Sequence, residues 1–224
     1  MSKEEKKNNE AIKDLSYAEM KQYMEFLDEC MLHLVENRTI FRDFDSALRQ
    51  QNAMVNPFIL WSLNNYKNNL IMGLCKMLEW KKRDNQTLRY FINSIKLKGE
   101  NQKVLENELK KATVNIQSVN TGKIRKEYVG DFLLNEFEKI DFEKDIKKIK
   151  EIHNSIKDYR NVKIAHQIQS IDDKGTTIPD LNTLNGYIDD LLKIIKQYHP
   201  LFRYSVDFGE DRKELYGNFH LTLK

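Results

Sequence analysis

The sequence predicts an all-α protein built as an antiparallel helical bundle. Its 224 residues are enough for one well-buried domain, yet they include only three prolines and eight glycines. Antiparallel sandwiches and barrels need frequent turns, which these two residue types usually form. Hydrophobic residues make up 40% of the chain and charged residues 32%, a balance that suits amphipathic helices with charged outer faces.

The first part of the chain predicts a polar tail followed by two helices. Residues 1–14 are expected to form a flexible tail. From Tyr17 to Leu34, apolar residues recur at steps of three and four, which is the period of one helix face. A second, short helix is expected over residues 39–50.

A long helix is expected to begin at Pro57, because Asn56 is a favourable N-cap residue and proline fits the first helical turn. Its apolar stripe runs to Trp80. Residues 84–140 are expected to form a helical insert in the bundle. The helices of this insert are expected near 88–98, 101–119 and 124–142, the last one interrupted at Gly130.

Two further helices close the predicted bundle. One begins near Phe142 and is followed by a polar loop over 169–182, and the last ends at Pro200. Alternating apolar residues then predict a small β-hairpin in a C-terminal extension over 204–224. The helical domain is therefore expected to span residues 15–203.

Composition also narrows the classes of function. A formal net charge of +3 is too small for binding nucleic acid by bulk electrostatics. Cys30 and Cys75 lie in apolar helical stretches without a CxxC pair, so buried inert thiols are expected rather than a disulfide or a zinc site. No cofactor and no metal site are expected. No stretch approaches the ~18 apolar residues of a membrane span, and the polar start differs from a secretory signal, so a cytoplasmic protein is expected.

The far end of the helix that begins near Phe142 carries the residues most suited to chemistry. The segment from Asp158 to Gln167 brings together Arg160, Asn161 and His166. Arginine presents a planar cationic fork that matches phosphate, and histidine exchanges protons near neutral pH. These residue types together suit phosphodiester chemistry, with histidine as general acid or base and arginine stabilising charge on phosphoryl oxygens.

The spacing of Arg160 and His166 leaves several arrangements open. Six positions on an ideal helix separate two side chains by about 120°, so the two residues do not share a face. Either the helix unwinds here, the long arginine side chain bridges the gap, or two chains complete the site together. The alternative is structural: a surface arginine paired with Asp158 or a nearby glutamate, and a histidine that caps a helix C-terminus.

The pattern Arg160-Asn161-x-x-x-Ala165-His166 resembles the motif of the HEPN superfamily, the higher eukaryotes and prokaryotes nucleotide-binding domains. The layout of the long helices over about residues 15–200 fits as well. Within the superfamily, the sequence is most similar to the abortive-infection U-type (AbiU2-like) branch of bacterial phage-defence proteins. The resemblance implies a HEPN-like antiparallel bundle that forms a homodimer, with two motif copies meeting in a cleft.

The resemblance also implies a reaction and residue roles. Many HEPN domains are metal-independent endoribonucleases of phage-defence and toxin–antitoxin systems, in which the RNA 2′-OH attacks the adjacent phosphate. Carried over to this chain, His166 is the proton-transfer residue, Arg160 contacts the scissile phosphate, and Asn161 orients one of the two. The implied partners are RNA, a second copy of the chain, and an antitoxin or another defence protein.

Supporting residues surround the motif in the sequence. Lys157 and Lys163 flank Arg160 and are candidates for binding RNA phosphates, although solvated lysines are the ordinary alternative. Glu79, Asp158 and Tyr159 are candidate supporting residues. Glu79 is expected to orient Arg160 across the bundle, and its alternative role is a helix-end carboxylate beside Lys81 and Lys82.

Two other functions remain open at this point. One is a non-catalytic HEPN-like dimeric module that binds RNA, nucleotide or a protein partner. The other is a helical interaction protein in which the motif is coincidental. The remaining histidines, His33, His153, His199 and His220, show no metal-ligand spacing and are expected to be packing or surface residues.

Overall fold

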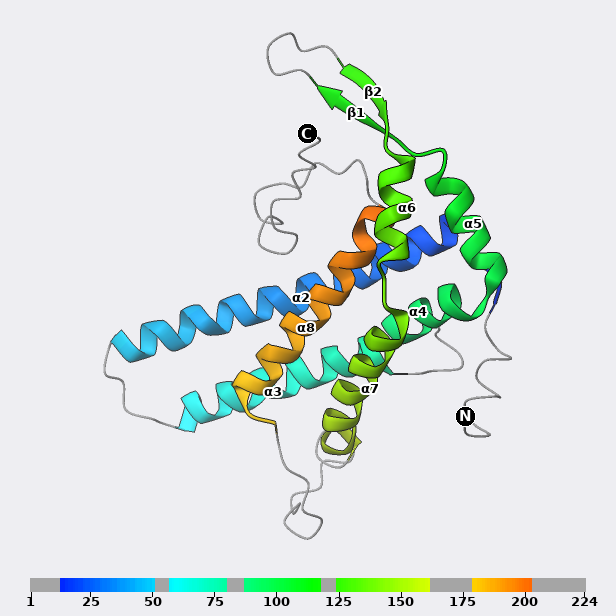
Figure 1. Cartoon of the computed structure of the whole chain (residues 1–224). Coiled ribbons are helices and arrows are strands. Elements are labelled where there is room, and N and C mark those ends of the chain that lie inside the picture. The colour runs from blue at the N-terminus through cyan, green and yellow to red at the C-terminus, as the bar shows by residue number, and fades with distance from the viewer. Residues whose placement is uncertain (1–12, 51–56, 80–86, 118–123, 162–178, 203–224) are drawn as a thin grey trace, which may run out of the picture.

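A computed structural model describes residues 13–50, 57–79, 87–117, 124–161 and 179–202. In these residues the chain forms seven α-helices and one two-stranded antiparallel ribbon, so the predicted all-α bundle is confirmed (Figure 1). The elements are α2 (Tyr17–Gln50), α3 (Pro57–Leu78), α4 (Leu88–Leu97), α5 (Gly99–Leu109), β1 (Thr113–Gln117), β2 (Ile124–Tyr128), α6 (Gly130–Glu138), α7 (Phe142–Tyr159) and α8 (Leu181–Phe202).

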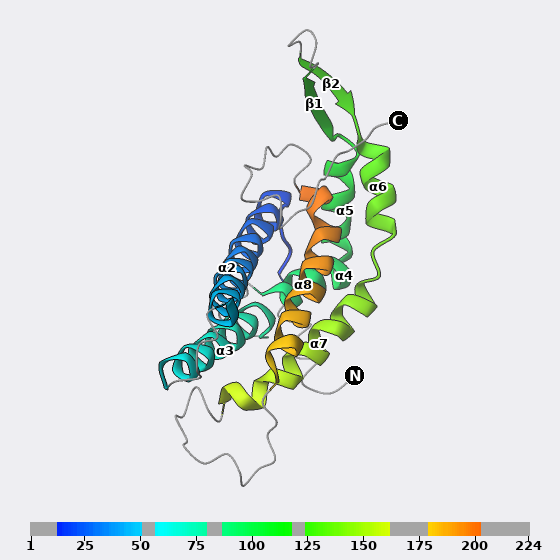
Figure 2. The same ribbon diagram turned by 90° about the vertical axis from the view of Figure 1, so that its left-hand side faces the viewer.

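Helix α8 lies at the centre of the bundle. Figure 2 shows α2 and α3 on one side of it and α6 and α7 on the other, and α8 contacts all four. The core that these helices share is apolar and almost free of solvent exposure. Its largest fully buried side chains are Tyr198, Phe91, Met20, Met24, Leu27 and Met31.

Helix α2 is one continuous helix of 34 residues, so the predicted break before residue 39 is wrong. Its second half is held in place by two neighbouring helices. Arg38 pairs with Asp189 of α8. Phe41 stacks on Tyr66 of α3, with ring centroids 4.0 Å apart. Packing against other helices thus extends α2 beyond its regular apolar stripe.

The chain before α2 is more ordered than the expected tail. The backbone N–H of Lys13 donates to the hydroxyl of Tyr90 at 3.2 Å, and the N–H of Leu15 donates to the side-chain oxygen of Asn101 at 2.7 Å. Lys98 approaches the carboxylate of Asp14 at 3.6 Å. Residues 13 and 14 therefore lie against the bundle, while residues 1–12 are outside the described residues.

The expected helix over 101–119 is wrong beyond Leu109. The chain instead forms β1, which pairs antiparallel with β2, and the N–H of Val129 donates to the carbonyl of Ala112 at 3.0 Å to close the base of the ribbon. Apolar residues at helical spacing suggested a helix, but the run Thr-Val-Asn-Ile that starts at Thr113 is rich in β-branched residues, which favour strands. The ribbon projects from one end of the bundle (Figure 1).

The sequence suggested that Gly130 interrupts a helix. In the structure, Gly130 instead begins helix α6. The side chain of Tyr128 lies over this glycine, so that an added Cβ would fall 2.4 Å from the tyrosine hydroxyl oxygen. That hydroxyl donates to the carboxylate of Asp131 at 3.0 Å. A side chain at this position would therefore displace the exposed ring of Tyr128 where the ribbon meets α6.

Helices α4, α5 and α6, which lie in the segment expected as a helical insert over 84–140, are part of the main core. Phe91 and Ile95 of α4 and Leu105 of α5 are fully buried, and Leu133 of α6 is 1% exposed. These residues belong to the same apolar cluster as α2, α3 and α8. The segment therefore contributes to the stability of the bundle.

Helix α8 continues two residues past Pro200, where the sequence predicted its end. Proline lacks the N–H that would bond the preceding turn, but here it lies within the last turn. Leu201 is fully buried, and its carbonyl accepts a hydrogen bond at 3.0 Å from the hydroxyl of Tyr17 in α2. Burial and this hydrogen bond stabilise the end of the helix. The predicted C-terminal hairpin over 204–224 lies outside the described residues.

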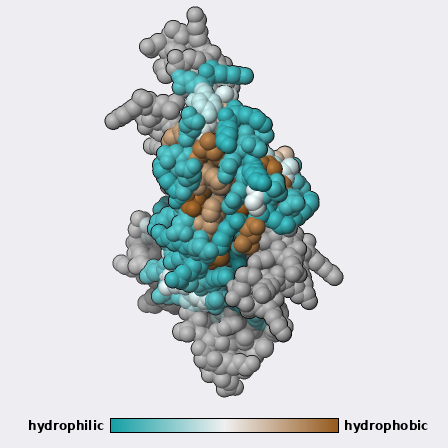
Figure 3. Space-filling view, turned by 45° about the vertical axis from the view of Figure 1, so that its right-hand side comes forward, coloured by the Kyte–Doolittle hydropathy of each residue, from teal (hydrophilic) through white to brown (hydrophobic). Residues whose placement is uncertain are grey.

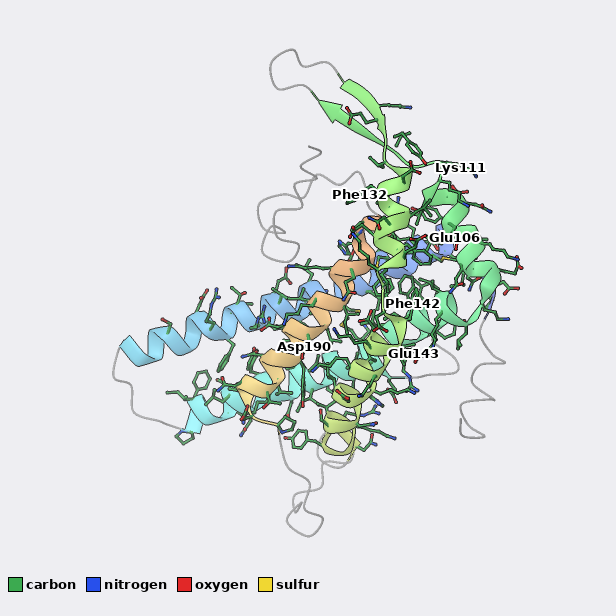
Figure 4. The ribbon with its side chains drawn as sticks, in the orientation of Figure 1. Glu106, Lys111, Phe132, Phe142, Glu143 and Asp190 are labelled. Atoms are coloured by element: carbon green, nitrogen blue, oxygen red, sulfur yellow. The ribbon has the colours of Figure 1, made fainter. Side chains whose placement is uncertain are left out.

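The surface of the bundle is mostly hydrophilic on the face of Figure 3, with a strip of hydrophobic residues along its middle. Charged pairs join neighbouring helices across the surface. Asp190 of α8 binds Lys148 of α7 at 2.8 Å, and Glu143 at the start of α7 pairs with Lys96 of α4 (Figure 4). None of the described helices is both long enough and apolar enough to span a bilayer.

Candidate functional site

The candidate site lies at the C-terminal end of α7. The N-cap residue of this helix is Asp141, whose carboxylate accepts a hydrogen bond from the backbone N–H of Lys144 at 3.0 Å. At the other end the backbone N–H of Arg160 bonds the carbonyls of Ile156 and Lys157. Arg160 is thus held by the helical backbone, at the end of the molecule opposite the ribbon (Figures 1 and 2).

Arg160 forms a two-pronged ion pair with Glu79, the residue that follows α3. Its Nη2 donates to Oε1 at 2.9 Å and its Nη1 donates to Oε2 at 3.3 Å. The side chains are 19% and 23% exposed, respectively. Parallel hydrogen bonds of this kind fix the orientation of a guanidinium as well as its charge partner. The two residues are 81 positions apart, and packing of α7 against α3 brings them together.

The other described motif residues fall into two groups. Tyr159 is buried, and its hydroxyl donates to the side-chain oxygen of Asn68 in α3 at 3.4 Å, so it anchors α7 to α3. Lys157 is exposed, and Asn161, which follows Arg160, is half-buried. Asp158 lies in the last turn of α7. Three of these residues are therefore neighbours of Arg160 along the chain, while Tyr159 joins the end of α7 to α3.

His153 is a site residue that the sequence pattern did not distinguish from a packing histidine. It is buried on α7, and Lys157 and Arg160 follow it at steps of four and three, which places all three on one helix face. Burial lowers its pKa, and the positive charges of Lys157, Arg89 and Arg160 lower it further, while Glu79 raises it. In the described part of the structure, its Nε2 is buried without a hydrogen-bond partner. In the sequence, the spacing of His153, Lys157 and Arg160 at i, i+4 and i+7 was the feature that could have placed His153 on the same helix face as Arg160.

Cys75 lies one turn before Glu79 on α3 and is buried, as the sequence predicted. Burial raises the pKa of its thiol to about 11, with a smaller opposing effect from Arg160. Cys30 is half-buried, and burial raises the pKa of its thiol as well. Because the thiolate is the reactive form, neither cysteine is suited to nucleophilic chemistry at neutral pH.

Two predicted site residues, His166 and Lys163, lie outside the described residues. The structure therefore brings together Arg160, Glu79 and Lys157 and adds His153 to them. Among the described side chains, no group of three His, Cys, Asp or Glu residues is placed to hold a metal ion. What the described residues offer is a fixed guanidinium with additional positive charge around it, an arrangement suited to binding phosphate.

Comparison with known proteins gives the family. The family model described as AbiU2, of the HEPN group, matches residues 36–220, which is well over half of the chain. No significant match is found among curated proteins or solved structures. The matched range covers the segments of α3 and α7 that carry Glu79 and Arg160. The chain therefore belongs to the AbiU2 family of HEPN-type abortive-infection modules.

Proposed function

We propose that this protein is a metal-independent endoribonuclease of phage defence or of a toxin–antitoxin pair. The observation that carries the proposal is the Arg160–Glu79 pair at the end of the motif helix. Glu79 engages one N–H group on each of the two terminal nitrogens, and the rest of the guanidinium fork can still face a phosphate. An arginine fixed in this way is ready to stabilise charge on phosphoryl oxygens without reorganisation.

The proposed reaction is cleavage by the substrate's own 2′-hydroxyl. The 2′-oxygen forms a bond to the adjacent phosphorus, and the bond from phosphorus to the 5′-oxygen breaks. The products are a 2′,3′-cyclic phosphate and a 5′-hydroxyl. His166 acts in proton transfer. A proton leaves the 2′-hydroxyl as it attacks the phosphorus, and a proton is added to the 5′-oxygen as its bond to phosphorus breaks. Arg160 binds the non-bridging oxygens, and Asn161 orients one of these groups.

The test is RNA cleavage by the full-length protein in EDTA. We expect Arg160→Ala to lower the rate by about 10² or more, because it removes charge stabilisation in the transition state. His166→Ala is expected to lower it by about 10²–10⁴. The matched controls are Arg42→Ala and His33→Ala, whose side chains are 69% and 75% exposed on α2. An inert wild-type protein, or cleavage that survives both motif substitutions, would contradict the proposal.

A homodimer is part of the proposal, and α3 offers a surface for it. Phe58, Trp61 and Met72 share the outer face of α3 and are 63%, 61% and 44% exposed. The rings of Phe58 and Trp61 stack with centroids 5.9 Å apart. In this highly charged chain, α3 carries only Lys67 and Lys76 as charged residues over 22 positions. Lys76 follows Met72 by one turn on this face, so the face carries one cation, and it can meet its own copy across a two-fold axis with little repulsion.

The oligomeric state tests this surface. Trp61→Asp is expected to shift the protein from dimer to monomer in analytical ultracentrifugation, because it places a charge in an apolar contact. Leu97→Asp is the control, since Leu97 is an exposed apolar residue on α4, at 40%. A wild-type monomer, or a dimer that survives Trp61→Asp, would contradict this interface.

A second candidate function is a non-catalytic module that binds RNA, nucleotide or a protein partner. The same ion pair favours it, because a carboxylate that neutralises Arg160 weakens the field available to a transition state. In that case RNA mobility would shift without cleavage, and Arg160→Ala would abolish the shift. Toxicity of the expressed protein in bacteria, relieved by His166→Ala, would favour the nuclease instead.

A further inference from the structure

The ribbon of β1 and β2 has less support from the bundle than any helix of the described structure. Figures 1 and 2 show it extending beyond the helices, and within the described residues its extensive contacts are those between its own two strands. It is anchored at its base, where the N–H of Val129 donates to the carbonyl of Ala112. A two-stranded ribbon alone is marginally stable in water, and further strands stabilise it. The ribbon therefore has the form of an incomplete sheet.

The hydrogen bond at the base of the ribbon shows which backbone groups face away from it. The N–H of Val129 points toward β1, and successive residues of a strand point their N–H and C=O groups to opposite sides. Every second residue of each strand therefore presents these groups on an open edge. In the register of the ribbon, the outward-facing residues are Thr113, Asn115 and Gln117 on β1 and Ile124, Lys126 and Tyr128 on β2.

The two open edges differ in charge. Strand β2 contains Arg125, Lys126 and Glu127, whereas β1 contains no charged residue and no proline. Charged residues and prolines are common means by which an edge strand is kept from pairing with another strand. Strand β1 is also rich in β-branched residues, which favour pairing. The edge of β1 is therefore the one open to a further strand.

A second copy of β1 matches this edge. In an antiparallel pair centred on Asn115, the two copies of Asn115 face each other, and Thr113 of each copy faces Gln117 of the other. Facing residues of this kind exchange two backbone hydrogen bonds, so every outward group of β1 gains a partner. No like charges meet, because β1 has none. The same pairing of β2 would instead place Lys126 opposite its own copy, which is unfavourable.

We propose that β1 pairs antiparallel with β1 of a second copy, so that two ribbons form one four-stranded sheet. The contact is separate from the surface around Trp61, because the start of α3 lies away from the ribbon in both views (Figures 1 and 2). Strands of five residues bury less than the roughly 1,000 Å² of a stable interface. The contact is therefore weak and joins dimers reversibly at high protein concentration. This inference does not depend on the proposed nuclease activity.

Disulfide trapping tests the pairing directly. Residues that exchange hydrogen bonds in an antiparallel pair have Cα atoms about 5.5 Å apart, a distance that a disulfide spans. Under mild oxidation with diamide, Asn115→Cys is expected to link two copies at least about tenfold faster than Lys126→Cys, because pairing holds its two thiols at a high effective concentration. Lys126 is the matched control, since it faces Asn115 across the ribbon.

The trapping experiment is made in the full-length Trp61→Asp protein, so that the α3 surface does not contribute. Linked dimers are measured over time on a non-reducing gel. Trp61→Asp without a new cysteine gives the background from Cys30 and Cys75.

Proline substitution tests the edge of the backbone. Asn115→Pro removes an N–H that faces away from β2, so the ribbon keeps its own hydrogen bonds while the proposed contact loses them at its centre. Lys126→Pro removes the corresponding outward N–H of β2. In sedimentation equilibrium from micromolar to near-millimolar concentration, the wild-type protein and Lys126→Pro are expected to gain mass, and Asn115→Pro is not. Circular dichroism checks that both variants are folded.

The outcomes separate this inference from the nuclease proposal. If Asn115→Cys is linked no faster than Lys126→Cys, or if the wild-type protein gains no mass, the edge of β1 is not a contact between copies. The inference also fails if Asn115→Pro gains mass as the wild-type protein does. If both prolines prevent the gain, the two cysteine rates decide between the edges. Self-association through β1 in a protein that leaves RNA intact would contradict only the nuclease.

Discussion

Two polar side-chain pairs at different depths show how similar contacts serve different purposes in this molecule. Asp28 of α2 and His199 of α8 are hydrogen bonded in the core, with side chains only 5% and 4% exposed. Glu79 and Arg160 pair near the surface, with side chains 23% and 19% exposed. The first pair joins the first and last described helices. The second joins the ends of α3 and α7.

The surroundings of the two pairs differ more than the pairs themselves. Apolar side chains of the main core enclose Asp28 and His199, so neither is accessible to a ligand. Near Arg160, by contrast, Lys157 is exposed and Arg89 is half-buried, and the charges of both act on His153 of the same helix as Arg160. The comparison teaches that pairing alone does not mark a functional site. Partial exposure distinguishes the pair that is accessible to a ligand.

The largest expected effect is at the core pair. Asp28→Ala removes one partner of a buried polar pair and is expected to destabilise the protein by about 3–5 kcal/mol. The free energy of unfolding, measured by urea denaturation, gives this value. If the free energy of unfolding falls by less than about 1 kcal/mol, the buried pair contributes no more to stability than an exposed one, and the two pairs do not differ in this respect.

A smaller loss is expected at the surface pair. Glu79→Ala is expected to destabilise the protein by about 1–3 kcal/mol, because Arg160 loses a charged hydrogen-bond partner but retains access to water. RNA cleavage is expected to fall mainly through kcat, since Arg160 is no longer oriented for the transition state. If Glu79→Ala lowered the free energy of unfolding as much as Asp28→Ala and left RNA cleavage by the folded protein unchanged, the role of Glu79 would be structural.

The pH dependence of stability sharpens the comparison at His153. Its folded-state pKa is lowered from the usual 6.5, chiefly by burial, so the unfolded chain binds the proton more readily. Stability is therefore expected to fall as pH drops from above 6.5 through the lowered pKa, and to level off below it. Urea denaturation at about pH 7.5 and about pH 5 checks this, and His153→Gln is expected to reduce the fall.

The exposed His33 provides the control for that experiment. Its side chain is 75% exposed, so His33→Gln is expected to leave the pH dependence of unfolding as in the wild-type protein. A pH profile that His153→Gln does not alter would show that the imidazole is as free in the folded chain as in the unfolded one.

The smallest expected effect is at a third pair, Arg38 and Asp189, whose side chains are 25% and 55% exposed. Asp189→Asn is expected to cost less than about 1 kcal/mol, because solvent screens an exposed ion pair. Comparing its free energy of unfolding with those of Glu79→Ala and Asp28→Ala gives a series ordered by depth. A larger loss at Asp189 would show that this contact holds the second half of α2 against α8.

The sequence predicted the helices whose apolar stripe and caps agreed. The start of α3 at Pro57 was expected from a capping residue, proline and periodicity together, and the start of α7 near Phe142 was expected from periodicity. The ribbon was missed because Leu105, Leu109, Ala112 and Ile116 recur at helical spacing by coincidence. Only the β-branched residues after Ala112 argued against a helix, and their preference for strands depends on context.

The candidate site was predictable in its residues but only partly in its contacts. The motif gave Arg160, and the long helix that ends before Glu79 suggested a partner for it across the bundle. The effect of Arg89 on the pKa of His153 could not be predicted, because it depends on how α4 packs against α7. His153 looked like an ordinary packing residue, since burial and neighbouring charge become visible only in three dimensions.

The link between the first and last described helices has a consequence for synthesis of the chain. Helix α2 is made before α8, and Asp28 meets His199 only after the 171 positions that separate them have been translated. Until then, the face of α2 that α8 covers has no partner on the nascent chain. A chain that stops before α8 would leave Asp28 without His199 and the central position of the bundle empty. In a cell that makes this protein, the bundle can therefore close only after α8 has been synthesised.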